Sequence, residues 1–111
     1  MEKRAAMKYA RVSPQKARLV VDLVRGRLCG DAINILRSTN KRIAPGIVKV
    51  LQSAIANATS GSSDVDVDKL YIKRIFVNEG PRQKRLRPAP MGRAYRYQRR
   101  TAHIVVEVSD E

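Results

Sequence analysis

The sequence has very few of the residues that build disulfides, metal sites and aromatic cores. Its 111 residues include one cysteine, Cys29, one histidine, His103, and no tryptophan. A single cysteine cannot form a disulfide within the chain, which excludes a disulfide-stapled secreted domain and suits a reducing cytosol. A protein zinc site takes three or four ligands, so two candidates far apart in the sequence do not predict one. We expect no metal, no other cofactor, and a core of Val, Ile, Leu and Ala.

The sequence also lacks a long apolar run. Its first residues, MEKRAAMKYAR, do not resemble a signal peptide, and no later run is long enough to span a bilayer. These features predict a cytoplasmic protein with no membrane partner. Because a chain this short supports one modest core, we expect a single domain over residues 1–111.

Acidic residues are scarce relative to basic ones. Ten Asp and Glu accompany 23 Lys and Arg, which gives a net charge of +13. Residues 80–100, GPRQKRLRPAPMGRAYRYQRR, hold eight of the positive charges and no acidic residue. Like charges this close together repel one another, and a protein usually carries them in order to bind a polyanionic partner. A basic surface that serves only solubility is the less favoured alternative.

Hydrophobic periodicity predicts an α+β fold, with three helices packed on a small antiparallel three-stranded sheet and a long protruding β-hairpin. Ser13 is the expected cap of a first helix that reaches Gly26, in which Leu19 and Leu23 widen the buried stripe. Asp31 is the expected cap of a second helix. The predicted helices cover 14–25, 32–38 and about 47–58, and the predicted strands cover 4–12, 70–80 and 101–108.

Two details of the second half matter for the fold. Strict alternation along the strand at 70–80 predicts one face with Tyr71, Lys73, Ile75 and Val77, and another with Ile72, Arg74 and Phe76. The segment before it, 59–68, is expected to be a polar linker. Its DVDVD sequence resembles the start of a calcium loop, but Lys69 and Ile75 stand where that loop needs glycine and glutamate.

The basic segment at 80–100 replaces a hairpin loop, which usually has two to five residues. It is either a disordered loop or a ribbon in which both strands continue. Ten residues in each direction, at roughly 3.3 Å apiece, would project about 30 Å from the body. An isolated two-stranded ribbon is marginal in water, so we expect a polyanion to order it.

The end of this hairpin and its tyrosines each allow two interpretations. The RPAPMG sequence, with two prolines and a glycine, favours either a turn that protects an exposed edge or a tip placed against a distant partner. Tyr95 and Tyr97 share one face of an extended arm. They either stack on unpaired bases or pack against the arm's own arginines.

We find no catalytic constellation, and we expect no enzyme activity. His103 has no nucleophile nearby in the sequence, so it is either structural or a hydrogen-bond donor to phosphate. There is no P-loop and no GxGxxG motif. A nucleic-acid enzyme would need paired carboxylates near the basic surface. A DNA-bending protein with basic β-arms is the rival from another class, but such arms are usually built on dimers, and no apolar face is spare for a homo-oligomer.

Five segments in order resemble a known family: SPQKARLVVDLVRG, NILRSTNK, VLQSAIANA, IFVNEGPRQKR and RRTAHIVVEVSD. This is the bacterial-type large-subunit ribosomal protein L twenty-two family, and the resemblance covers essentially the whole chain. It implies a structural constituent of the large ribosomal subunit that binds large-subunit ribosomal RNA and supports subunit assembly. The implied partners also include neighbouring large-subunit proteins and the nascent polypeptide, because the hairpin would line the peptide exit tunnel. An organellar ribosome is an alternative location.

The resemblance also implies which residues bind RNA. On the body these are Arg11, Lys16, Arg18, Arg25, Lys41 and Arg42. On the arm they are Arg82, Lys84, Arg85, Arg87, Arg93, Arg96, Arg99 and Arg100. The tunnel-facing tip would comprise Pro88, Ala89, Pro90, Met91 and Gly92. This tip departs from the PRAKGRA-like sequence common in the family, because it has lost positive charge and gained a proline and a methionine. The resemblance therefore implies where the tip lies but not which contacts its extreme end makes.

Overall fold

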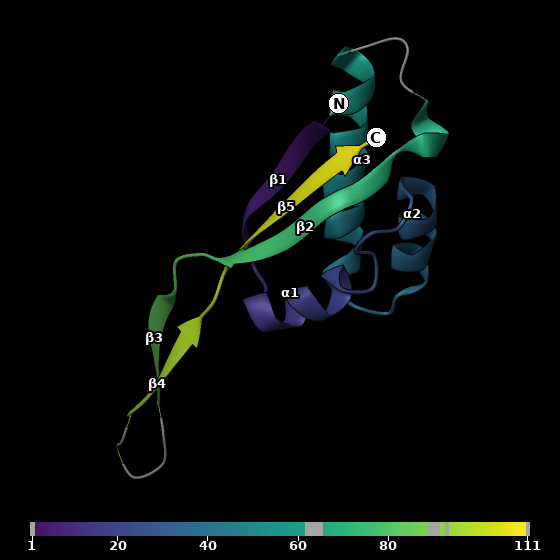
Figure 1. Ribbon diagram of the computed structural model, residues 1–111. Coiled ribbons are helices and arrows are strands. Elements are labelled where there is room, and N and C mark those ends of the chain that lie inside the picture. Colours follow the sequence, from purple (N-terminus) through teal and green to yellow (C-terminus); the bar gives the residue numbers. More distant parts are fainter. Residues whose placement is uncertain (1, 62–65, 89–91, 93, 111) are drawn as a thin grey trace.

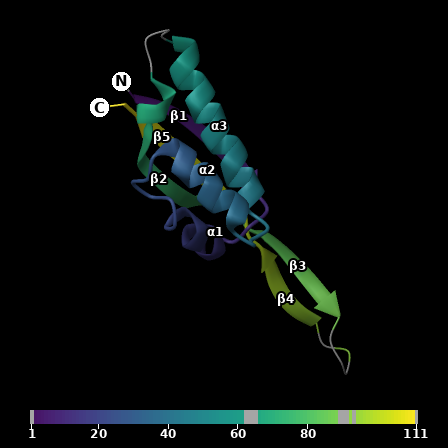
Figure 2. The same ribbon diagram turned by 90° about the vertical axis from the view of Figure 1, so that its right-hand side faces the viewer.

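The computed structural model describes residues 2–61, 66–88, 92 and 94–110, and for residues 61, 83, 85–88 and 94–98 it describes the backbone only. Within these residues, three helices cover one face of a three-stranded antiparallel sheet, and a two-stranded ribbon continues beyond one end of that sheet (Figure 1). The α+β architecture predicted from the sequence is confirmed. A turned view shows α2 and α3 lying against the same face of the sheet (Figure 2).

The elements follow one another in a simple order along the chain. The strand order is β1-β5-β2 in the sheet and β3-β4 in the ribbon. All pairings are antiparallel. The bounds are β1 Glu2–Ala10, α1 Pro14–Val21, α2 Cys29–Ser38, α3 Ala44–Gly61, a 3₁₀ turn Val67–Lys69, β2 Tyr71–Glu79, β3 Gln83–Pro88, β4 Ala94–Arg99 and β5 Ala102–Ser109.

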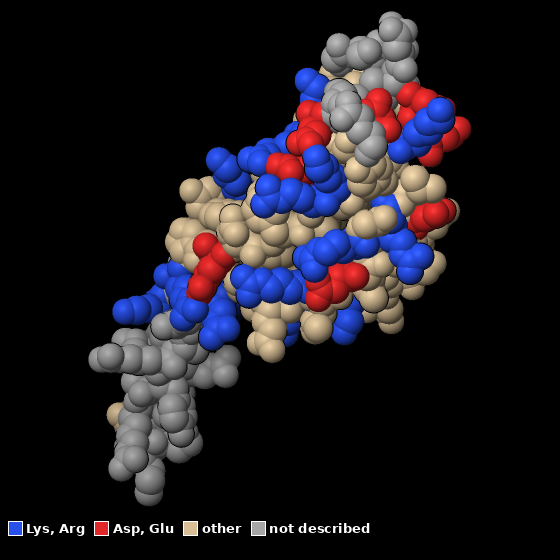
Figure 3. All heavy atoms as spheres, in the orientation of Figure 1, with Lys and Arg blue, Asp and Glu red and all other residues tan. Residues whose placement is uncertain are grey.

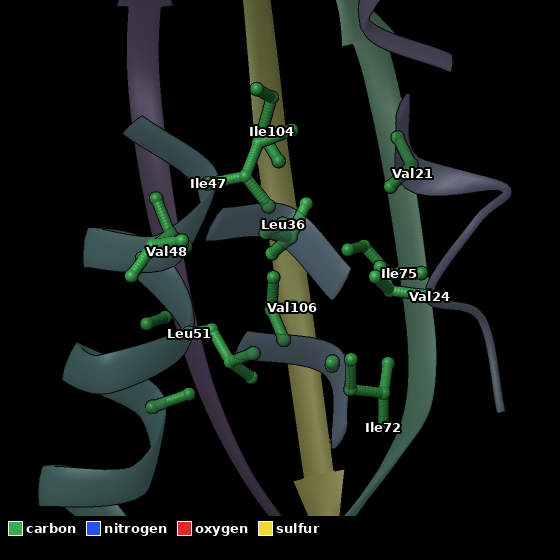
Figure 4. Packing of buried hydrophobic residues seen from close by; sticks show 14 of the residues in the cluster. Val21, Val24, Leu36, Ile47, Val48, Leu51, Ile72, Ile75, Ile104 and Val106 are labelled. Carbon is green, nitrogen blue, oxygen red and sulfur yellow. The ribbon is translucent and has the colours of Figure 1, made fainter. Parts of the chain in front are cut away.

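The core lies between the helices and the sheet, and it is aliphatic. Ile104 and Val106 of the central strand β5 face Leu36 of α2 and the α3 residues Ile47 and Leu51 (Figure 4). All five are at most 1% exposed. Fully burying such a side chain contributes roughly 1.5–3 kcal/mol, so this layer is the main source of stability. The body therefore has its own core without any contribution from the arm.

The first helix is shorter than its sequence predicts. Ser13 is the N-cap as expected, and its Oγ accepts the backbone N–H of Lys16 at 3.3 Å. The helix ends at Val21, however, and the chain continues to Gly26 in tight turns with hydrogen bonds to the third preceding residue. These turns bury Val24 and leave Leu23 48% exposed.

Leu19 does not widen the buried stripe either, because it is 62% exposed. The prediction of a helix reaching Gly26 with both leucines buried was therefore wrong. Gly26 itself has a φ of 77°, a conformation that glycine adopts at little cost after a helix.

The second helix begins at Cys29, three residues before its predicted first residue, and without the predicted cap. Its N-cap is Leu28, which makes no side-chain capping bond, and Asp31 lies in the first turn. The reason is a tertiary contact. The Cys29 N–H donates to the Leu70 backbone oxygen at 2.9 Å, and Leu28 forms an isolated bridge with Tyr71. The start of β2 thus fixes where α2 begins.

The third helix contains Pro45 and Gly46 in its first turn, as predicted. It extends to Gly61, so the first residues of the predicted linker at 59–68 are helical, and Val67–Lys69 form a 3₁₀ turn. The other linker residues, 62–65, lie outside the described part. A Cβ at Gly46 would lie 3.3 Å from the Met7 Cε, which shows how closely the start of α3 approaches β1.

Two strands depart from strict alternation. The β1 strand occupies 2–10 instead of 4–12, and its register with β5 shifts between Met7 and Ala10. In β2 the register shifts between Ile72 and Arg74, so Ile72 shares the buried face with Ile75 and Val77. The predicted faces of β2 were therefore wrong at its first residues, because an extra residue at a bulge reverses the alternation there.

Candidate nucleic-acid interface

The arm is a paired ribbon, which favours that alternative over a disordered loop. The strands β3 and β4 pair in register over six residues each, which corresponds to about 20 Å of ribbon. This pairing places Arg85 opposite Tyr97 and Arg87 opposite Tyr95. Whether the tyrosines pack on arginines or stack on bases stays a prediction, because these four side chains lie outside the described part.

Half of the predicted RNA-binding side chains of the arm are described. Arg82, Lys84, Arg99 and Arg100 are all exposed, and all lie where the arm leaves the body. Arg93 and the tip residues Ala89, Pro90 and Met91 lie outside the described residues, as do the side chains of Arg85, Arg87, Pro88 and Arg96. Gly92 has a φ of 72°, which fits the predicted glycine turn near the tip.

A tight joint connects the arm to the body. The Gly80 N–H donates to the Thr101 backbone oxygen at 2.9 Å, and the Thr101 hydroxyl donates to the Pro81 oxygen at 2.7 Å. A Cβ at Gly80 would lie only 2.5 Å from the Thr101 Oγ1. Arg82, at the start of the arm, pairs with Glu79 at the end of β2. These contacts join the ribbon to the β2–β5 pair.

Two predicted RNA-binding residues of the body, Arg18 and Arg25, lie along the outer edge of β2. Arg18 donates from Nη2 to the Val77 oxygen at 3.0 Å, and Arg25 donates from Nη2 to the Ile75 oxygen at 3.0 Å. Arg25 also forms an ion pair with Asp22 at 2.8 Å. Because β2 is an edge strand, these side chains cover carbonyls that would otherwise offer a site for strand addition.

Those contacts leave much of each guanidinium for another ligand, because arginine has five N–H donors. Both side chains remain exposed, as do the predicted RNA-binding residues Arg11 and Lys16. Lys41 and Arg42 are also exposed and stand before the start of α3. The structure thus brings Arg18 and Arg25 together along one edge, while Lys41 and Arg42 lie on a separate loop.

The face of the sheet that no helix covers carries a row of charged side chains that was not predicted from the sequence. Glu107 on the central strand is buried between Arg4 on β1 and Arg74 on β2. The Arg4 Nε donates to the Glu107 Oε1 at 3.1 Å, and the Arg74 Nε lies 3.9 Å from the Glu107 Oε2. Its hydrogen bond with Arg4 lowers the pKa of the Glu107 carboxyl.

Both arginines nevertheless stay accessible, with side chains 60% and 64% exposed. Arg74 also lies over the Phe76 ring, 5.5 Å from its centroid. At the end of the same face, Lys73 pairs with Glu2, and the hydrogen bond that Lys73 donates to this carboxylate raises the pKa of Lys73. A glutamate within a β-branched run was the one sequence signal for this arrangement.

His103 has a structural role in the fold. Its Nδ1 accepts the Tyr9 N–H at 3.0 Å, and its ring makes an edge contact with the Tyr9 ring, with centroids 4.9 Å apart. The prediction that His103 is structural is therefore supported, because its Nδ1 accepts a hydrogen bond within the fold. The contact between Tyr9 and His103 could not be predicted from the sequence, because the two residues lie 94 positions apart.

Basic side chains dominate the helix-free face, although acidic ones stand among them (Figure 3). Within the described residues, no three His, Cys, Asp or Glu gather as a metal site would require. No helix among those same residues is long and apolar enough to cross a membrane. What the site offers is a set of exposed cations on two sides of a small body and at the root of a ribbon.

Comparison with known proteins identifies the family. The family model described as ribosomal protein L22p/L17e matches residues 5–109. A protein of Solibacter usitatus named large ribosomal subunit protein uL22 is 65% identical over 111 residues, which cover 100% of this chain and 98% of the relative. A protein of the same name from Koribacter versatilis is 51% identical over 115 residues, covering 100% of this chain and 69% of the relative. One from Mycoplasma capricolum is 48% identical over 111 residues, with 100% and 99% covered. The chain therefore belongs to the ribosomal protein L22p/L17e family.

Proposed function

We propose that this protein is a structural constituent of the bacterial large ribosomal subunit in the cytoplasm, and that it binds large-subunit ribosomal RNA through its arm and body. The observation that carries the proposal is the ribbon of β3 and β4, joined to the body at Gly80 and Thr101. Eight Lys and Arg and no acidic residue occupy residues 80–100. The family match and three relatives named as large-subunit proteins support it.

The arm binds through phosphates. Each phosphate neutralised by a lysine or arginine releases counterions, and this term grows with the number of contacts. Arginines outnumber lysines seven to one in residues 80–100, and the planar guanidinium can bridge phosphate oxygens. Among the described residues, β3 and β4 contact chiefly each other. An isolated two-stranded ribbon is only marginally stable in water, so RNA on its sides would stabilise the pairing.

The body adds a second set of contacts. Arg11, Lys16, Arg18 and Arg25 are exposed along and beside α1, and Lys41 and Arg42 are exposed before α3. Arg18 and Arg25 have two roles, because each uses one donor on a β2 carbonyl and can offer others to phosphate. Contacts on body and arm together would link separate RNA segments, which is how the protein supports subunit assembly.

The tip has a different role from the rest of the arm. Residues 88–92 carry no charge, so they add nothing to the phosphate-binding term. By the resemblance to its family, the tip faces the exit tunnel and meets the nascent polypeptide, and neighbouring large-subunit proteins adjoin the body. In this account residues 1–111 form one domain with an arm at about 80–100, and the protein acts by binding and not by catalysis.

Sedimentation of the tagged full chain from a bacterial lysate tests this proposal. We expect the protein to migrate with the large subunit, and mild RNase treatment to release it. As a control, free tagged protein is added to the lysate after RNase treatment, and it should stay at the top of the gradient. Migration apart from ribosomal particles in untreated lysate would contradict the proposed function.

A further inference from the structure

Tyr9 combines an exposed aromatic ring with a strained backbone. Its φ is 59°, and among the described residues it is the one non-glycine residue with a positive φ. An L-residue in this left-handed region carries a steric penalty, and residues held there tend to cluster at functional sites. The residue is 63% exposed, the highest value among the large hydrophobic residues that the structure describes. Tyr9 therefore joins an unfavourable backbone conformation with an aromatic ring that lies in solvent and not in the core.

The fold holds this ring in a fixed place. The register of β1 with β5 shifts between Met7 and Ala10, so Tyr9 belongs to an irregular step of the strand. The Tyr9 N–H donates to the His103 Nδ1 at 3.0 Å, and the two rings meet at 88°. A perpendicular contact leaves at least one face of the Tyr9 ring uncovered by the imidazole. His103 is on the central strand, which anchors the pair to the sheet.

The surroundings of the ring are cationic and lie at the root of the arm. Lys8 and Arg11 flank Tyr9 in sequence, and both are exposed. Ala10, next to Tyr9, pairs with Ala102. Ala102 directly follows Thr101, which forms the joint, and Arg100, which is exposed, precedes Thr101. Glu79 pairs with that same Ala102 position, but its carboxylate is engaged by Arg82.

We propose that Tyr9 is a stacking platform for one unpaired base of RNA, with Lys8 and Arg11 binding the adjoining phosphates. An exposed ring among cations matches a single-stranded nucleotide, which offers a flat base beside a negative charge. A paired base is already stacked on both sides, so a duplex gives the ring no free base face. This inference rests on the proposed RNA-binding function and adds a defined subsite to it.

A tryptophan reporter tests the contact directly, because the chain contains no tryptophan. In the full-length Tyr9→Trp variant, we expect an eight-nucleotide single-stranded oligoadenylate to quench the emission. A duplex of the same length and an abasic strand with the same phosphates should quench it little. Val67→Trp is the matched control, since Val67 is 44% exposed and precedes β2 at the opposite end of the sheet from Tyr9. Equal quenching at both positions, or equal quenching by the abasic strand, would overturn the proposal.

Affinity measurements separate stacking from charge and from folding. Asparagine tolerates the left-handed region, so Tyr9→Asn should not lower the melting temperature of the free protein. Base stacking on an aromatic ring corresponds to about a 5- to 150-fold change in affinity, and we expect Tyr9→Asn to bind oligoadenylate more weakly by that factor. Tyr9→Phe should bind normally. The salt dependence should be unchanged in Tyr9→Asn and shallower in Arg11→Gln.

The outcomes distinguish this inference from the broader function. Wild-type protein that binds RNA with a steep salt dependence, together with Tyr9→Asn of equal affinity, would overturn the stacking platform alone. Wild-type protein that does not bind RNA at all would overturn both.

Discussion

Arg18 on α1 donates a hydrogen bond from its Nη2 to the backbone oxygen of Val77 on β2, at 3.0 Å. This contact joins a residue of the SPQKAR segment to the edge strand that leads into the arm. Arg25 makes the corresponding contact with Ile75. An arginine that the family resemblance assigns to RNA therefore also stabilises the body, so loss of binding in an Arg18 variant needs a stability control.

Replacing Arg18 with alanine should lower the free energy of unfolding of the free protein by about 1–2 kcal/mol. Hydrogen bonds from charged groups contribute roughly 1.5–3 kcal/mol, and the value is smaller here because the side chain is exposed to screening solvent. Lys16→Ala removes the same charge from the same helix and should change the unfolding free energy by less than about 0.5 kcal/mol. Urea denaturation of both variants measures the difference, and equal destabilisation would contradict the edge contact.

Glu107 should make stability depend on acid pH. Because its hydrogen bond with Arg4 lowers the pKa in the folded state, the stabilisation is present above the unfolded value of about 4.5 and is lost as pH falls through the folded value. Glu107→Gln should cost on the order of 1 kcal/mol at pH 7, since both flanking arginines are more than half exposed. Unfolding measured from pH 7 to pH 2 should show the two proteins converging. A constant difference across that range would argue against the ion pair.

Gly80 should resist substitution because of its contact with Thr101. A Cβ would lie 2.5 Å from the Thr101 Oγ1, so Gly80→Ala forces the joint apart and should destabilise the protein by about 1–3 kcal/mol. Thr101→Ala removes the clashing hydroxyl. The double variant should therefore be less destabilised than the sum of the single variants, although the Thr101 backbone carbon and oxygen at 3.3 Å limit the recovery. If the losses of thermal stability in the two single variants simply add up in the double variant, the contact with the Thr101 hydroxyl is not what makes Gly80→Ala unfavourable.

The uncharged tip should be dispensable for anchoring. If Pro88–Gly92 is replaced by a short Asn-Gly turn, which suits a two-residue hairpin, the variant keeps every cation of the arm. The family resemblance places the tip in the exit tunnel and implies that changes at the tip alter the response to macrolide antibiotics. We therefore expect near-normal occupancy in purified large subunits, together with altered macrolide sensitivity or nascent-chain pausing in the same cells. Poor incorporation would show that the tip is an assembly anchor. Full incorporation with unaltered drug response and pausing would leave the tip as a protected turn.

The general fold could be predicted from the sequence because its signals are local. Ser13 and Pro14 mark the start of α1, and the β-branched run in TAHIVVEV marks β5. The missed features depend on contacts between distant segments. Asp31 is not the cap of α2, because the Cys29 N–H pairs with Leu70 and starts the helix earlier. Bulges are also invisible to simple alternation, and the one in β2 moved Ile72 to the buried face.

In the candidate site, too, some features could be predicted from the sequence and others could not. A run of arginines without acids is visible in the sequence and predicts a polyanion partner. The double role of Arg18, the pairing of Glu107 with Arg4 and the contact of Tyr9 with His103 are not visible, because their partners lie 59, 103 and 94 residues apart, respectively. The prediction that Leu23 is buried is wrong because helical periodicity alone cannot say where a helix ends. Leu19 lies within α1 but outside its buried face, which contains Ala17, Val20 and Val21.

The most direct test of the account is the salt dependence of binding between the full chain and large-subunit ribosomal RNA, measured by filter binding. If 6–10 phosphates are neutralised, affinity should fall by about 10³–10⁵ between 50 and 200 mM salt. A triple variant, Lys84→Gln with Arg99→Gln and Arg100→Gln, should reduce the slope of log affinity against log salt by about 2–3. A steep slope that becomes shallower in the triple variant is the predicted result, and a flat salt dependence of the wild-type protein would contradict the account.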